Sequence, residues 1–237
     1  INDSDDHAAS SGESFGLAIP LYNFGENSAS GVSATLSTGS NVVTISNSTA
    51  SYGNIDVGES SYGDDFTLSI SSNAIQYEDL ELKITINDND GNQWESLIDI
   101  DVLGSYLVST GSVSIQPGQT SNININLTNQ GSLNASHVSG ILSFSGNLIT
   151  VNDDSGTWGN INSGSSVNSS NGFNITASSD IVNGTMLNLQ LHIQDNNGYN
   201  RIESVTLKVG TVSIDDPLGP DQYGYYIYDS GDTDYDL

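Results

Sequence analysis

The chain of 237 residues contains no cysteine and only three basic residues, Lys83, Arg201 and Lys208. Without cysteine, neither a disulfide framework nor a thiolate metal site can form. Against the three cations stand 29 acidic residues, so the formal net charge is −26. A surface this acidic repels the phosphates of nucleic acids and of anionic membranes. We therefore expect no nucleic-acid partner.

Long apolar runs are missing as well, because no segment approaches the roughly 18–20 apolar residues of a membrane-spanning helix. No basic-then-apolar leader opens the chain at Ile1, so any secretion signal is expected to lie upstream or to have been removed. Asn, Ser, Thr and Gly are abundant, whereas Lys and Arg are scarce. This balance is typical of extracellular or salt-exposed proteins. We expect a secreted or cell-surface location without membrane insertion.

The chain contains a tandem repeat of one module. At a shift of about 106 residues, segment 21–25 aligns with 127–131 and segment 52–55 aligns with 158–161. One inserted residue then moves the shift to 107. A fixed period indicates that each copy folds as one structural module. The matches are core-type positions and turn glycines, and no set of reactive side chains recurs. The repeated feature is therefore a scaffold.

Both modules are predicted to be all-β. Apolar residues alternate with Ser, Thr, Asn and Asp in short runs, and turn-forming clusters separate the runs. About seven short antiparallel strands in about 105 residues are typical of an immunoglobulin-like sandwich without the cysteine pair. The prediction is two tandem immunoglobulin-like antiparallel β-sandwiches, residues 1–104 and 105–209, followed by a short tail, residues 210–237.

The repeat also predicts which side chains fill the two cores. Tyr52 and Trp158 occupy one repeat position and are expected to be core aromatics. Three further pairs of equivalent positions are expected to be buried: Phe66 and Phe173, Leu82 and Leu189, Ile100 and Leu207.

Several of the aligned segments resemble a known kind of module. Asn129-Gln-Gly131, residues 52–55 with Gly58, and the Asp-rich hairpin ending in Gly91 are similar to CARDB-like, immunoglobulin-like tandem repeats. Such repeats occur in large secreted surface proteins of Bacteroidota-type bacteria, including those that accompany gingipain-like peptidases. Residues 219–229 resemble a segment that follows such modules. The resemblance covers nearly the whole chain and implies a non-catalytic surface module. No peptidase Cys–His pair carries over, because cysteine is absent.

The two ends of the repeat differ. Module 2 opens with Gly-Ser-Val-Ser-Ile at 111–115, whereas the same offset in module 1 gives Asp-His-Ala-Ala at 6–9. Module 1 is therefore expected to lack its first strand. Residues 210–214, Gly-Thr-Val-Ser-Ile, supply a matching strand with no module behind it. A sandwich that lacks a strand exposes an unpaired edge, which a free strand can fill.

Three interpretations of these ends remain open. In the first, Val212 and Ile214 enter a neighbouring copy, and the head-to-tail contact propagates into a surface filament or array. The acceptor positions are then Leu17, Ile19 and Leu21. In the second, the ends are those of a longer tandem array whose third module is omitted. In the third, the chain is an adhesin or other binding module, or the accessory region of a larger secreted enzyme.

Asp88, Asp90 and Asp195 are the candidate metal ligands. Residues 87–92 and 195–198 resemble part of a calcium loop, with oxygen ligands on alternate residues and a glycine for the sharp turn. No Glu stands at the twelfth loop position, and Asn/Asp-Gly is also a preferred hairpin turn. A hairpin turn is thus the favoured interpretation, and calcium is the cofactor left open.

Catalysis is not predicted. His7, His137 and His192 show no metal-ligand spacing, and the chain has neither a nucleophile elbow nor a phosphate loop. We expect that the protein is not an enzyme.

Carbohydrate is the remaining partner or modification to consider. Tyrosines recur through residues 223–228, which favours a strand docked on a sandwich over a sugar-stacking surface. Asn-x-Ser/Thr sequons are no more numerous than chance predicts in a chain so rich in these residues, so they do not establish glycosylation. The sequons begin at Asn2, Asn47, Asn126, Asn134, Asn168, Asn174 and Asn183.

Overall fold

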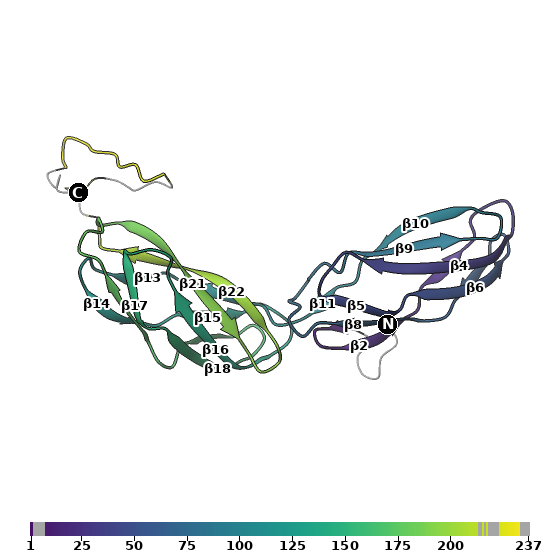
Figure 1. Cartoon of the computed structure of the whole chain (residues 1–237), viewed down its shortest axis with the longest axis horizontal. Helices are drawn as coiled ribbons and strands as arrows, with labels where there is room; N and C mark the ends of the chain where they lie inside the picture. The colour runs from purple at the N-terminus through teal and green to yellow at the C-terminus, as the bar shows by residue number, and fades with distance from the viewer. Residues whose placement is uncertain (2–7, 213–214, 216, 218–222, 233–237) are drawn as a thin grey trace. The chain divides into compact units, whose positions relative to one another are not determined.

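The computed structural model describes residues 1, 8–212, 215, 217 and 223–232. These residues form strands, turns and loops, and the all-β prediction is confirmed. In the described part of the chain, no helix has the length and apolar character needed to cross a membrane. Two compact units are present (Figure 1): unit 1 is Ile1–Ser105 with Gly131–Leu133, and unit 2 is Tyr106–Gln130 with Asn134–Leu237.

The described residues of unit 1 form four sheets, with strand orders β10-β9-β4-β6, β2-β8-β5, β3-β7 and β1-β11. The strands are β1 (Ala9–Ser10), β2 (Ser14–Leu17), β3 (Pro20–Tyr22), β4 (Ala29–Thr38), β5 (Val43–Asn47), β6 (Thr49–Ile55), β7 (Ser60–Tyr62), β8 (Phe66–Ile70), β9 (Leu82–Asn87), β10 (Gln93–Ile98) and β11 (Val102–Leu103).

The described residues of unit 2 repeat this plan in three sheets, ordered β13-β22-β21-β16-β18, β14-β20-β17 and β12-β15-β19. The strands are β12 (Leu107–Thr110), β13 (Val113–Ile115), β14 (Thr120–Ile123), β15 (Asn126–Asn129), β16 (Ala135–Ser143), β17 (Ile149–Asp153), β18 (Ser155–Ile161), β19 (Ser166–Asn168), β20 (Phe173–Ala177), β21 (Thr185–Gln194) and β22 (Asn200–Val209). One difference matters below: β12 adds a third strand to β15-β19, whereas the sheet of β3 and β7 has two strands in the part of unit 1 that the structure describes.

The cores follow from period-two alternation along the strands. In β4, Val32, Ala34 and Leu36 are buried, and the residues between them face outward. Of the six predicted core positions, five are buried, including Phe66 and Phe173 at 0% exposure. Ile100 is only partly buried. It lies in the break between β10 and β11, whereas its counterpart Leu207 is inside the continuous strand β22.

The two predicted core aromatics are confirmed as buried, and they make the same contact in each unit. Tyr52 is 6% exposed, and its hydroxyl donates to the Ile19 carbonyl at 2.8 Å. Trp158 is 5% exposed, and its indole N–H donates to the Ile125 carbonyl at 2.8 Å. Because Ile19 and Ile125 are equivalent in the repeat, both aromatics satisfy their polar atom at one shared position.

The prediction that module 1 lacks its first strand is wrong. Ala9 and Ser10 form β1, which pairs in parallel with Val102 and Leu103. In unit 2, β13 pairs in parallel with β22, and the rung Ile115–Val209 corresponds to Ala9–Val102. Alanine is a poor strand former, so local pattern missed this strand. Burial holds it, since Ala9 is 1% exposed. These two parallel pairs also depart from the purely antiparallel prediction.

Candidate functional site

One edge of unit 1, along β3, has a single strand partner among the described residues. Among the described residues, β3 pairs only with β7, whereas its counterpart β15 lies between β19 and β12. Leu107 of β12 is fully buried beside Asn129. On the repeat shift, Ile1 corresponds to Leu107, and it packs partly buried against the core of unit 1. Residues 2–4, which align with the rest of β12, lie outside the described residues.

Two equivalent asparagines make different hydrogen bonds at these two edges. The side-chain amides of Asn23 and Asn129 donate to the carbonyls of Ile55 and Ile161, at 3.0 and 3.1 Å. The Asn129 carbonyl oxygen then accepts the amide of Tyr106, at the start of β12, at 3.1 Å. The Asn23 carbonyl oxygen instead accepts the nearby Gly25 amide at 2.9 Å. Asn129 therefore holds the edge strand of unit 2, whereas Asn23 accepts a hydrogen bond from its own loop in unit 1.

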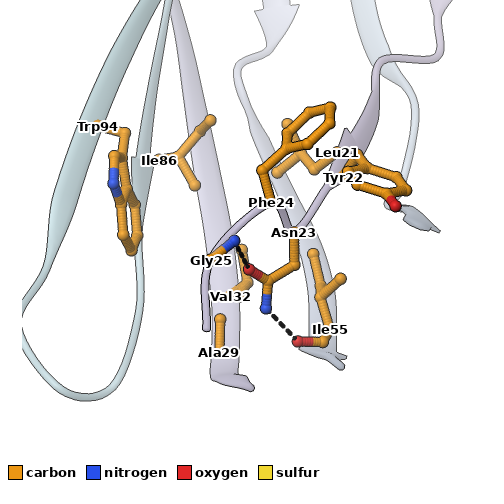
Figure 2. A pocket seen from close by; sticks show the side chains of 10 residues that line it. All are labelled: Leu21, Tyr22, Asn23, Phe24, Gly25, Ala29, Val32, Ile55, Ile86 and Trp94. Atoms are coloured by element: carbon orange, nitrogen blue, oxygen red, sulfur yellow. Dashed lines mark hydrogen bonds between the residues drawn. The ribbon is translucent and has the colours of Figure 1, made fainter. Parts of the chain in front are cut away.

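A pocket of about 330 Å³ opens beside this edge (Figure 2). Its lining is mostly apolar and includes no charged residue: Leu21, Tyr22, Asn23, Phe24, Gly25, Ala29, Val32, Ile55, Ile86 and Trp94. Val32 and Ile55 are also members of the buried core of unit 1. Figure 2 places Trp94 and Tyr22 on opposite sides with Phe24 between them. The pocket therefore gives access to the interior of the unit between aromatic walls.

The aromatic side chains at the rim of the pocket are unusually exposed to solvent. Phe24 is 90% exposed, Tyr22 49% and Trp94 48%. The rings of Tyr22 and Phe24 lie with centroids 4.2 Å apart and are tilted by 51°. Clustered exposed apolar side chains mark interaction surfaces more often than scattered ones do. Within the described residues, the backbone amide of Phe24 has no acceptor.

Unit 2 closes the corresponding region with its own residues. The positions equivalent to Leu21, Val32, Ile55 and Ile86 are each at most 1% exposed: Leu127, Val138, Ile161 and Ile193. The buried Leu107 lies beside them in β12. Tyr199 is 3% exposed, and its hydroxyl bonds both the amide and the carbonyl of Leu107. In unit 1 the position of Tyr199 is taken by Asn92, which has no ring to contribute.

The predicted acceptor residues are only partly brought to this edge. Leu17 is buried in β2 and pairs with Phe66. Ile19 is partly buried between β2 and β3. Leu21 lies in β3 and lines the pocket. The incomplete edge is therefore at Leu21 rather than along all three residues, because β1 already holds the place expected to be vacant. Val212 is partly buried, and Ile214 lies outside the described residues.

The candidate calcium ligands belong to hairpin turns. Asp88 Oδ1 accepts the amides of Asp90 and Asn92, and Oδ2 accepts the Asn92 side-chain amide at 2.8 Å. These bonds, led by that of the Asn92 side chain, lower the pKa of Asp88. Asp195 likewise accepts the amides of Asn197 and Tyr199. Among the described residues, no three His, Cys, Asp or Glu side chains are grouped as metal ligands. The geometry is that of a side-chain-capped turn.

The sequon asparagines are spread over both units, apart from Asn2, which lies outside the described residues. Asn126 and Asn168 face each other across β15 and β19, with a side-chain bond of 3.2 Å. Asn174 donates to Asn122 at 2.7 Å on the neighbouring sheet. The other positions are the end of β5, the loop before β16 and the turn before β21: Asn47, Asn134 and Asn183.

The pocket was not anticipated from the sequence, although the repeat carried a signal for it. At four positions of the repeat, an exposed apolar residue of unit 1 aligns with a polar residue of unit 2. The pairs are Tyr22 and Thr128, Phe24 and Gln130, Tyr62 and Asn168, and Trp94 and Arg201. Positions where two copies of one scaffold diverge in this way are candidates for function added to one copy.

Comparisons with known proteins establish no family. No family model matches the sequence, and no curated protein matches it. Among solved structures, a protein of unknown function from Porphyromonas gingivalis W83 aligns at 10% identity and a TM-score of 0.27, over 85% of this chain and 94% of that one. Red sea bream transglutaminase aligns at 10% identity and a TM-score of 0.41, over 87% of this chain. The alignment covers 30% of the transglutaminase.

Proposed function

We propose that this chain is a non-enzymatic extracellular structural protein built from two tandem immunoglobulin-like sandwiches. Support comes from the repeated sheets, in which β10-β9-β4-β6 corresponds to β22-β21-β16-β18 and β2-β8-β5 to β14-β20-β17. A scaffold repeated without a shared constellation of reactive side chains suits a spacer or an assembly unit. Net charge of −26 and the absence of cysteine suit a soluble surface outside the cell.

The subunit assembles with copies of itself through unit 1. One observation carries this part of the proposal: β3 has a single described partner, while the equivalent β15 is covered by β12. An incomplete sheet edge is a template for an added strand. Because the acceptor is in unit 1 and the donor at the other end of the chain, the contact is head-to-tail and repeats from copy to copy.

Residues 210–214 are the donor. Their sequence, Gly-Thr-Val-Ser-Ile, matches residues 111–115, which contain β13, and Val212 and Ile214 supply alternating apolar side chains. Because β1 holds the β13 place in unit 1, we propose that the donor takes the β12 place beside β3. Pro20 limits where the donor pairs, because proline has no N–H to offer an adjacent strand. Pairing is therefore concentrated at the Leu21–Phe24 end of the edge, next to the pocket.

Assembly is tested by negative-stain imaging and light scattering of the full chain in moderate salt, which screens repulsion between acidic copies. We expect head-to-tail oligomers or filaments. The double variant Val212→Asp, Ile214→Asp is expected to be monomeric with unchanged melting. Met186→Asp, Ile202→Asp is the matched control, since both residues are exposed, at 56% and 66%, on β21 and β22. Polymers that survive the first double variant rule out this donor.

A second candidate is a binding module or the accessory region of a larger secreted enzyme. The exposed rim residues Tyr22, Phe24 and Trp94 favour it, because aromatic clusters also recognise foreign ligands. This alternative predicts a monomer at all accessible concentrations. A wild-type chain that stays monomeric in moderate salt would therefore replace the assembly proposal with this one.

A further inference from the structure

One exchange between the repeats falls two residues from the pocket residue Trp94. Tyr199 in unit 2 buries its ring and bonds Leu107 through its hydroxyl. At the same position of unit 1, Asn92 turns its side chain to Asp88. The place that Tyr199 takes in unit 2 thus has no ring in unit 1, and the pocket opens beside Trp94, two residues further along.

We propose that this pocket receives a tyrosine side chain from residues 223–228 of a second copy. The proposal rests on the head-to-tail assembly above and names what the segment beyond the donor strand does. Unit 2 indicates the chemistry of the occupant, because the corresponding region of that unit is closed by a tyrosine beside an edge strand. In unit 1 a second copy supplies both parts.

The donor segment has the required character. Tyr223 is 75% exposed, Tyr225 71% and Ile227 69%, so most of each side chain is in contact with solvent. Residues 223–228 contain no charge, although 29 acidic residues are spread through the chain. The pocket lining is uncharged as well. Contact between two copies that repel each other electrostatically is least costly where neither surface carries an acid.

The size and polarity of the pocket favour a side chain over a sugar. At about 330 Å³ the pocket is at the lower end of the roughly 300–1,000 Å³ that ligand sites span. Sugars need several convergent hydrogen-bonding groups. The one side-chain amide of the lining, Asn23, already donates to Asn27 and Ile55 and accepts from Gly25. The other polar side-chain groups of the lining are the Tyr22 hydroxyl and the Trp94 indole N–H. An apolar ring with one hydroxyl at its tip is the better match.

The test uses a synthetic peptide of residues 223–230 and the full chain, with Trp94 fluorescence as the readout. Trp94 is 48% exposed and Trp158 only 5%, so entry of a ring shifts the Trp94 signal, and Trp94→Phe identifies its source. We expect saturable binding, and a loss of about tenfold or more in affinity when the peptide tyrosines are replaced by serine. A response to soluble oligosaccharide but not to the peptide overturns the proposal.

Asn92→Tyr provides the sharper variant, because it supplies unit 1 with the ring that unit 2 has. It is expected to block peptide binding, whereas Asn92→Ala, which loses the same bond to Asp88, keeps it. Equal binding to both variants overturns the proposal. Filaments that form normally in Asn92→Tyr also overturn it while leaving the proposed function intact. If the wild-type chain binds the peptide but never assembles, the pocket proposal is supported and the filament proposal is contradicted.

Discussion

The hydroxyl of Tyr199 lies 3.2 Å from the amide nitrogen of Leu107 and 3.3 Å from its carbonyl oxygen. A residue of the β21–β22 hairpin is thereby joined to the first residue of β12, 92 positions earlier in the chain. Both residues are buried. Closure of unit 2 at this end depends on the pair, whereas the equivalent of Tyr199 in unit 1, Asn92, donates to Asp88.

Removing this hydroxyl changes the alkaline stability of unit 2. Burial raises the pKa of Tyr199 to about 12, against its ordinary 10.0. A raised folded-state pKa contributes stability that is complete below pH 10 and is lost as pH rises toward 12. Tyr199→Phe is expected to lose about 0.5–1.5 kcal/mol at neutral pH and to show a shallower decline above pH 10. Denaturant melts across that range measure both effects. A decline as steep as in wild type would contradict the assignment.

Core truncations should rank by burial. Phe173→Ala is expected to destabilise unit 2 by about 3–5 kcal/mol, because the ring is fully buried. Ile100→Ala is expected to cost clearly less than Leu207→Ala, its repeat partner, because Ile100 lies between strands and is half-buried. Urea unfolding of the four variants, with Phe66→Ala as the unit 1 reference, provides the ranking. Equal losses at Ile100 and Leu207 would mean that the strand break is not real.

Gly156 is required by the ring opposite it. A Cβ at this position would overlap the Phe173 ring. Gly156→Ala is therefore expected to cost about 1–3 kcal/mol through overpacking. The double variant Gly156→Ala, Phe173→Leu should recover part of that loss relative to additivity, because the smaller side chain makes room. Strict additivity in a double-mutant cycle would show that the methyl group is accommodated elsewhere.

The Asp88 turn predicts a small effect confined to acid. Bonds from Asn92 and neighbouring amides lower the pKa of Asp88 below 3.8. A depressed folded-state pKa contributes stability above pH 3.8 that is lost as pH falls through the lower value. Asp88→Asn is expected to flatten the acid side of the melting profile, and Asp90→Asn, whose carboxylate does not accept the turn amides, is the control. Chelator is expected to leave melting unchanged. A fall in melting temperature with chelator would revive calcium at this turn.

Much of the scaffold was predictable from the sequence because it is encoded locally. Alternation marked the strands around Val32, Phe66 and Leu82, and the repeat identified Tyr52 and Trp158 as equivalent core residues. β1 was missed because Ala9 and Ser10 have little strand preference and are held by Val102, more than 90 positions later. Pairing direction and partner are properties of the assembled sheet, and local pattern does not carry them.

The pocket was beyond sequence reasoning for a related reason. Asn92 and Tyr199 are aligned in the repeat, but only Tyr199 closes its unit. That difference depends on where each hairpin meets β3 or β15. From the sequence alone, Phe24 would be predicted to be a core residue, and only the structure shows that it is exposed. The divergence between Trp94 and Arg201 becomes informative only when both positions are known to lie at the same edge.

The parallel pairs β1-β11 and β13-β22 determine how each unit responds to mechanical load. β13 lies near the start of unit 2 and β22 is its last strand. Tension applied through the chain therefore slides these two parallel strands lengthwise past each other. The evenly spaced bonds of a parallel ladder then bear the force together instead of opening one at a time. Unit 2 has three such rungs and unit 1 has two. A stretched chain is therefore expected to yield first in unit 1.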